Sequence, residues 1–164
     1  MTVSQYRLAK RSLQRLAEGH ALQEKVVKRA IELCDVDFTV IEVLRTREKQ
    51  EVLVADGASK TMNSRHLTGH AVDLGAWVNG SVRWDWEHYF KIAKAMQQAA
   101  IEYNVRIVWG GCWECINDAG DLKAAQERYI ARKKKQGKKP FLDGPHFELT
   151  RADYPEVCPV CGKK

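Results

Sequence analysis

The sequence lacks any long apolar stretch. Its first twenty residues mix charged and polar side chains throughout, so they lack the uninterrupted apolar segment of a secretory signal. No later segment approaches the roughly 20 apolar residues that cross a bilayer as a helix. We therefore expect synthesis and folding in the cytoplasm. If the protein acts outside that compartment, another factor must release it.

Internal repeats and low-complexity linkers are also absent from the sequence. A chain of 164 residues has the length of one ordinary domain and can build one core. Hydrophobic residues make up 45% and charged residues 29%, close to the averages of soluble globular proteins, which excludes wholesale disorder. We expect a single domain over residues 1–164, with a tail at 155–164, and one functional site.

The chain has only five cysteines, and an odd number without a secretory signal argues against a disulfide framework. Four of them form two CxxC pairs, Cys112 with Cys115 and Cys158 with Cys161. Two such pairs are typical of a zinc ribbon, although the gap between these pairs is much longer than usual. One interpretation is a second, structural zinc that pins the tail to the loop around Cys112. The other is a set of reduced thiols.

The charge balance is positive, with a formal net charge of +6. This balance favours anionic partners, which include nucleic acid, acidic lipid surfaces and cell-wall polymers. The strongest local concentration is the run from Arg132 to Lys135, with Lys138 and Lys139 shortly after it. Such a run is often only a solvated helix face. As a hypothesis, it attracts the protein to anionic wall polymers or to the phosphate-rich outer membrane of a Gram-negative cell.

The pattern of apolar residues predicts the order of helices and strands. Helical spacing predicts helices around residues 8–16 and 26–33, over Arg47–Ala55, over Trp86–Tyr103 and within the basic segment 121–139. Apolar and β-branched runs predict strands at residues 37–44, Ala71–Val78, 106–111 and His146–Leu149, and Asn79-Gly80 predicts a turn. This order predicts an α+β fold, a small and mostly antiparallel sheet with flanking helices.

Four aromatic residues, Trp84, Trp86, Tyr89 and Phe90, cluster at the start of the long predicted helix. They could line a surface on which sugars stack. Aromatic residues at helical spacing more often belong to a core, however, so we assign all four to packing.

The segment SRHLTGHAVDL places His66 and Asp73 on either side of a turn that contains glycine. Asp73 lies within an apolar predicted strand, where an unpaired carboxylate is costly to bury. A metal ion removes this cost, and zinc accepts both imidazole and carboxylate ligands. The pair therefore indicates two ligands of a zinc site.

A third ligand must come from elsewhere, because catalytic zinc usually keeps three protein ligands. The segment Asp143-Gly144-Pro145-His146 is a candidate, since Pro145 restricts the backbone on both sides and holds Asp143 and His146 in a defined relation. One residue could bind metal while the other transfers protons. The pair therefore supplies a ligand and an acid or base.

The HExxH motif of many metalloproteases is missing. His66 and His70 stand four residues apart, but Leu67 occupies the place of the required glutamate and Gly69 weakens a helix there. We therefore do not expect His70 to bind the metal.

The pattern Ser-x-His-x-x-Gly-x-Ala-x-Asp-Leu, followed far downstream by Asp-x-Pro-His-Phe-Glu-Leu, resembles the signature of the D-Ala-D-Ala and L-Ala-D-Glu zinc peptidases of the lysostaphin and hedgehog fold group. The phage endolysin branch, L-alanyl-D-glutamate peptidases, matches best. The likeness covers residues 12–155, and includes SLQRL, DFTVIEVLRTREKQ, KTMNSRHLTGHAVDL, the WGG turn and DGPHFEL. It departs at Leu44, where relatives often have Gly or Tyr, and at the CWEC segment.

The resemblance implies a role for each matching residue. His66, Asp73 and His146 would be the ligands of Zn²⁺, and Asp143 would be the catalytic acid and base. Arg45 matches an arginine placed near the reacting carbonyl. The departures affect residues outside these positions, so they concern specificity more than chemistry.

The resemblance also implies a substrate and a setting. Ser64 and Gln50 match positions that bind substrate, which would be the stem peptide of peptidoglycan, cut between L-Ala and D-Glu. The protein would be a monomeric phage lysis enzyme. It would be made in the cytoplasm of the host bacterium and would reach the periplasmic cell wall after a holin opens the membrane.

Three alternatives remain open. A D-Ala-D-Ala carboxypeptidase or dipeptidase would share the metal site, although a cellular enzyme of this kind normally carries a signal peptide. A hedgehog-like relative would bind zinc without catalysis. A basic nucleic-acid-binding module with a four-cysteine zinc site would explain the charge and the CxxC pairs, but not the two histidine motifs. We therefore expect no nucleic acid as partner.

Overall fold

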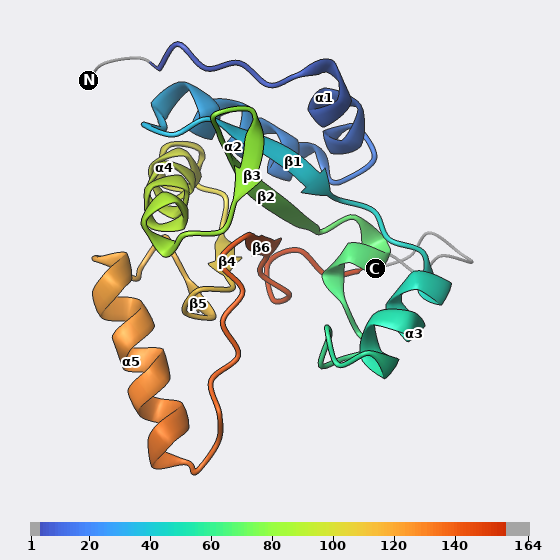
Figure 1. The fold of residues 1–164 in the computed structure, drawn as a ribbon, viewed down its shortest axis with the longest axis vertical. Coiled ribbons are helices and arrows are strands. Elements are labelled where there is room, and N and C mark those ends of the chain that lie inside the picture. The colour runs from blue at the N-terminus through green and yellow to red at the C-terminus, as the bar shows by residue number, and fades with distance from the viewer. Residues whose placement is uncertain (1–3, 157–164) are drawn as a thin grey trace.

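The computed structural model describes residues 4–156, in which the chain alternates between helices and short strands (Figure 1). In chain order the elements are α1 (Lys10–Leu16), α2 (Ala21–Leu33), β1 (Phe38–Glu42), α3 (Arg47–Ala55), the 3-10 helix η1 (Arg65–Thr68), β2 (Ala71–Val78), β3 (Ser81–Arg83), α4 (Trp86–Tyr103), β4 (Ile107–Trp109), β5 (Glu114–Cys115), α5 (Leu122–Lys135) and β6 (His146–Leu149).

The strands form one sheet in the order β1-β2-β6-β4-β5, and every pairing is antiparallel. Strand β2 is central. β1 pairs along one of its edges, while β6 and β3 share the other, with β6 opposite residues 71–73 and β3 opposite residues 76–78. Strand β6 is thereby inserted beside β2, although α4, α5 and the three strands β3, β4 and β5 separate them in sequence.

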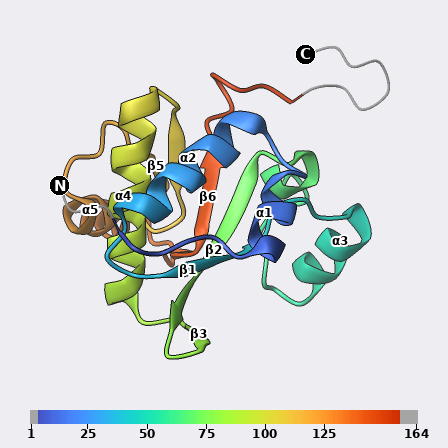
Figure 2. The same ribbon diagram turned by 90° about the horizontal axis from the view of Figure 1, so that it is seen from above.

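Helices α2 and α4 pack against each other on one side of the sheet, and α2 crosses over β6 when the molecule is seen from above (Figures 1 and 2). Val72, Leu74, Phe147 and Leu149 are fully buried in the core. Because successive side chains of a strand point to opposite faces, Asp73, His146 and Glu148 lie on the other face. α3 and α5 flank that side of the molecule, well apart from each other (Figure 1).

The predicted α+β class and the antiparallel sheet are confirmed, and so are all the predicted helices and strands. The bounds of four elements agree with the prediction: Arg47–Ala55, Ala71–Val78, Trp86–Tyr103 and His146–Leu149. The Asn79-Gly80 turn has positive φ at both residues and begins a hairpin to β3. Strands β3 and β5 were missed, because three and two residues are too few to show a period.

The assignment of the aromatic residues to packing holds for Tyr89, Phe90 and Trp86, whose ring contacts those of Phe90 and Trp109, and is wrong for Trp84. Tyr89 is buried and its hydroxyl donates to the carbonyl of Arg83, and Phe90 packs against the core. Trp84 is 62% exposed and Trp86 36%. Trp84 precedes the helix and stacks on Tyr89 from outside, so helical periodicity does not govern its position.

Within residues 4–156, no helix combines the length and the apolar character needed to cross a membrane.

Candidate metal and peptidase site

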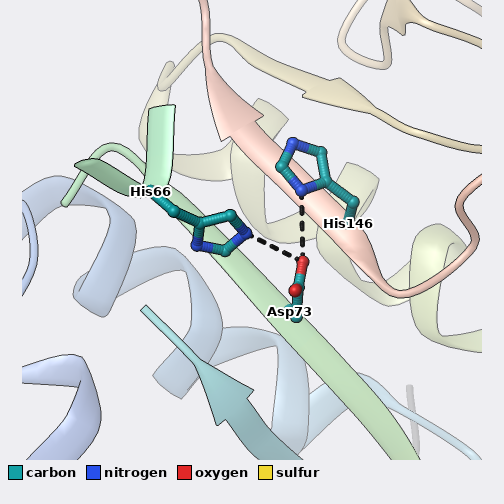
Figure 3. Close-up of side chains that lie close together, drawn as sticks. All are labelled: His66, Asp73 and His146. Carbon is teal, nitrogen blue, oxygen red and sulfur yellow. Dashed lines mark hydrogen bonds and ion pairs between the residues drawn. The ribbon is translucent and has the colours of Figure 1, made fainter. Parts of the chain in front are cut away.

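Three side chains from separate parts of the chain converge on the face of the sheet opposite the core (Figure 3). Asp73 projects from β2, His146 from β6 and His66 from η1. His66 Nε2 and His146 Nδ1 each lie 3.1 Å from Asp73 Oδ1. One ligand atom from each residue lies within 4.8 Å of the others, so the group could hold a metal ion.

The strand register explains this meeting. In the antiparallel ladder, Asp73 lies directly opposite His146 on one side and opposite Glu42 on the other. Directly opposed residues share a face of the sheet. His66 reaches the same face because η1 leads directly into β2, where Ser64 caps η1 by accepting a hydrogen bond from the backbone N–H of His66 at 3.2 Å.

In each histidine, the ring nitrogen that faces away from Asp73 also forms a hydrogen bond. These bonds show which nitrogen carries the proton, and so whether the three side chains can bind a cation. His66 Nδ1 lies 2.8 Å from the carbonyl oxygen of Val43, which can only accept, so Nδ1 carries the proton. His146 Nε2 lies 2.8 Å from the carboxylate of Glu148 and donates to it. In neutral rings, the two nitrogens that face Asp73 are therefore lone pairs directed at a carboxylate. Three acceptors aimed at one point fit a metal cation.

The charges of Asp73 and His146 influence each other strongly. Burial alone would raise the pKa of Asp73, but hydrogen bonds with His146 and His66 hold it well below the usual carboxyl range. Burial opposes the charged form of His146, yet Asp73 and Glu148 raise its pKa to about 10. The cluster therefore favours positive charge beside Asp73.

Asp143 lines the same cleft, three residues before His146. Burial and the negative charge of Asp73 both raise its pKa, as expected for a carboxyl group that exchanges protons during a reaction. Its backbone is fixed, because Asp143 N–H donates to the carbonyl of Gly110 at 2.9 Å and Gly110 N–H donates to that of His146 at 2.8 Å. Together these bonds hold the loop before β6 in place.

The WGG turn is therefore part of the site's support. A Cβ atom added at Gly110 would overlap the carbonyl oxygen of Asp143 and lie 3.1 Å from Cβ of His146. Trp109, at the end of β4, donates from its indole nitrogen to the carbonyl of Gly144 at 2.7 Å. The turn thus holds the loop with Asp143 and His146 against the sheet.

Arg45 approaches the cluster from the end of β1. Its Nε donates to Glu42 at 2.6 Å and its Nη1 to the side-chain oxygen of Gln50 at 2.7 Å. Its Nη2 lies 3.7 Å from Asp73 Oδ2. The guanidinium is only 10% exposed, so it is a fixed positive charge on the wall of the cleft.

Comparison with known proteins gives this geometry a context. The family model described as phage L-alanyl-D-glutamate peptidase matches residues 4–150. The chain belongs to this family. The curated L-alanyl-D-glutamate peptidase of Escherichia phage T5 is 30% identical over 149 residues, which cover 88% of this chain and 98% of the relative. The expected family is thereby confirmed.

Two further relatives agree. The L-alanyl-D-glutamate peptidase of Listeria phage A118 is 32% identical over 94 residues, 57% of this chain and 32% of the relative. The crystal structure of the L-Ala D-Glu endopeptidase ChiX of Serratia marcescens superposes with a TM-score of 0.70 and 35% identity. The match covers 91% of this chain and 94% of the other. Fold and family thus point to the same class of peptidase.

The two residues predicted to bind substrate have different surroundings in this peptidase. Ser64 lines the cleft that contains His66, Asp73 and His146, the three candidate ligands that we call the metal group. Gln50 is fully buried, and its amide nitrogen donates to Ser59 Oγ at 2.8 Å and to the carbonyl of Thr61 at 2.6 Å. All its polar atoms are engaged inside the protein, so it holds Arg45 and the loop after α3, and substrate contact by Gln50 has no structural support.

His70 lies outside the cluster, as its sequence context predicts. Its Nδ1 lies 2.8 Å from Thr68 Oγ1, and its ring packs on that of His20 with centroids 5.3 Å apart. Burial and the charge of Arg65 lower its pKa. His70 thus takes part in the packing beside η1.

The possible cysteine site can be described only in part. Cys112 is buried and Cys115 half-buried, and both are free thiols. Burial raises the pKa of Cys112, which favours the inert thiol form. Cys158 and Cys161 lie outside the described residues, so the second zinc stays a prediction.

Sequence reasoning missed Glu148 and Glu42, which support the site from opposite sides. Glu148 accepts the ring proton of His146, and Glu42 fixes Arg45 and also contacts Lys49. The spacing of two in His146-Phe147-Glu148 was a usable signal, since it places both polar residues on one face of a strand. Glu42 gave no such signal, because its role depends on pairing between β1 and β2.

Proposed function

We propose that the chain is a zinc endopeptidase that cleaves the bond between L-Ala and D-Glu in the stem peptides of peptidoglycan. The observation that carries the proposal is the convergence of His66, Asp73 and His146, with two imidazole lone pairs directed at one carboxylate oxygen. Zinc fits this set because it accepts mixed nitrogen and oxygen ligands and leaves a position open for substrate or water. The bond and the substrate follow the names of the family and the relatives.

When bound, zinc would polarise the scissile carbonyl and acidify water at the site. Asp143 would accept the proton of the attacking water on its carboxylate and then donate it to the departing amine of D-Glu. Its raised pKa suits both steps, because the group must take up the proton and keep it until the C–N bond breaks. Arg45, held by Glu42 and Gln50, would stabilise the negative charge that develops on the carbonyl oxygen.

The test is purified protein acting on isolated peptidoglycan, with and without a chelator. We expect new N-terminal D-Glu, lost with chelator and restored by zinc. Release of free D-Ala would instead support the D-Ala-D-Ala carboxypeptidase. The Asp143→Ala variant separates the enzyme from a non-catalytic zinc-binding relative, since the proposal expects loss of hydrolysis with zinc still bound. Hydrolysis that survives the chelator would overturn the metal's role.

The basic run on α5 also has a proposed role. Lys134, Lys135 and Lys138 are exposed and lie outside the clefts of the active face. We propose that they attract a monomeric enzyme to anionic wall or outer-membrane surfaces after a holin has released it from the host cytoplasm. Neutralising them should weaken binding to whole walls at low salt and leave the cleavage of a small soluble peptide unchanged.

A further inference from the structure

A second cleft adjoins the cleft of the metal group. The first has a volume of about 340 Å³ and contains His66, Asp73, Asp143 and His146. The second, of about 490 Å³, lies between α5 and the loops that face it. Three residues, Lys60, Trp113 and Phe141, line both clefts, so the two clefts adjoin.

Positive charge dominates the second cleft. Four cationic side chains line it, and none of its described lining residues is acidic: Lys60, Arg132, Lys133 and Lys139. Arg132 lies 3.9 Å from Glu114, whereas the other three form no ion pair with any residue in the range 4–156. A concave surface with several unneutralised cations attracts an anion more strongly than a flat one.

Aromatic side chains make the second cleft, a cationic groove, rigid. The Tyr129 hydroxyl donates to the carbonyl of Phe141 and accepts from its N–H, which fixes the return segment against α5. Trp113 donates from its indole nitrogen to the same carbonyl at 2.7 Å and stacks on the Phe141 ring. Arg132 and Lys133 lie over the Tyr129 ring, at 5.6 and 5.8 Å from its centroid. The cations are thus held on a preformed wall.

Trp113 connects this wall to the metal group. Its ring lies 5.4 Å from that of His146, and its backbone adopts a φ of +52°, which is unusual for a bulky residue. Strained backbone of this kind is retained where the surrounding structure holds it in place, often beside a functional site. In this backbone conformation, the indole ring of Trp113 lines both clefts.

The proposed substrate has a matching charge. A glutamate whose amine forms the scissile bond has two carboxyl groups, and only one of them can continue the peptide. The leaving half therefore keeps a free carboxylate on the glutamate itself, close to the cut bond. Any carboxylate at the C-terminus of the peptide is additional. Asp143, which would protonate the leaving amine, lies two residues from Phe141, so the leaving half would extend toward the groove.

We propose that the groove formed by Trp113, Phe141, Arg132, Lys133 and Lys139 is the subsite for the leaving half of the substrate and recognises its free carboxylate. The inference rests on the proposed function and adds a specificity to it. The enzyme should prefer stem peptides with an ionised D-Glu over those in which that carboxyl group is amidated.

The experiment compares two soluble stem peptides, identical except that the free carboxyl of D-Glu is ionised in one and a carboxamide in the other. Steady-state kinetics would be measured for the wild type, for Arg132→Gln with Lys133→Gln, and for Lys134→Gln with Lys135→Gln. The last pair removes the same charge from the same helix outside the groove. We expect the wild type to favour the acid by about tenfold in kcat/KM, the sum of two partly exposed ion pairs. This preference should be lost in the groove variant, mainly through KM, and kept in the control.

The outcomes distinguish the two proposals. If the wild type cleaves both peptides equally, the subsite is wrong while the peptidase stands. If it cleaves neither, the proposed function fails first. If both the groove variant and the control variant bind insoluble walls more weakly but cleave the soluble peptides as the wild type does, all these cations serve to attract the polymer. That result would overturn the inference. If the groove variant is unstable, Lys139→Gln tests the same point. Raised ionic strength is a second test, because salt screens the interaction with the ionised substrate and not with the amidated one.

Discussion

Replacing Glu148 tests whether the carboxylate behind His146 orients the metal ligand. Glu148 accepts the Nε2 proton of His146 at 2.8 Å, and its side chain is only 16% exposed. Burial would raise its pKa, but His146 lowers it, so the partner is a charged carboxylate. The bond fixes the ring so that Nδ1 faces Asp73.

The magnitude follows from this geometry. Loss of a partner that orients a metal-binding histidine typically weakens metal affinity by about 10- to 100-fold, or roughly 1.4 to 2.7 kcal/mol. We expect a loss in this range for Glu148→Ala. Glu148→Gln keeps an oxygen that can accept the proton but removes its charge, and charge-assisted bonds are roughly twice as strong as neutral ones. It should therefore lose about tenfold or less.

The assay is competition for zinc against a chromophoric chelator, measured without substrate so that catalysis does not enter. Glu127→Gln, a substitution of an exposed glutamate on α5, is the control for charge alone. Circular dichroism would establish that each variant is folded. A Glu148→Ala variant that binds zinc within about twofold of the wild type would refute the role of Glu148, because the ring would then be oriented without it.

Three further predictions concern the same site. Asp143→Asn should reduce kcat by about 10² to 10⁴ and leave zinc affinity almost unchanged; a parallel loss of zinc would make Asp143 a ligand instead. Zinc affinity should rise with pH, by up to about tenfold per unit between pH 6 and 9, because His146, with a pKa raised to about 10 despite its burial, must release a proton. Calorimetry in buffers of different ionisation enthalpy would detect that proton. Gly110→Ala should lower the free energy of unfolding by about 1 to 3 kcal/mol, measured in urea, since its Cβ would displace the loop of Asp143; unchanged stability and activity would contradict the contact.

Local patterns were sufficient to predict most elements of the fold. The helix over Trp86–Tyr103 has a regular apolar stripe, and Thr46 and Asp121 cap α3 and α5 with their side chains. These features act over a few residues, so they can be recognised in the sequence. The exposed Trp84 was misjudged for the same reason, because it lies before the helix whose period was applied to it.

The sequence by itself determined which residues are the candidates for the chemistry. An aspartate in an apolar strand and a histidine next to a fixed turn imply a metal before any fold is known, and the spacing of the two motifs identifies the family. These properties belong to short segments, whose chemistry does not depend on their partners.

Only the tertiary structure decided how the segments meet. The pairing of β2 with β6 brings Asp73 opposite His146, 73 residues later, and the carbonyl of Val43 and the carboxylate of Glu148 set which ring nitrogens face the metal position. The position of the cationic groove next to this cleft likewise depends on the packing of α5. Strand register and packing depend on contacts far apart in sequence, so no local pattern encodes them.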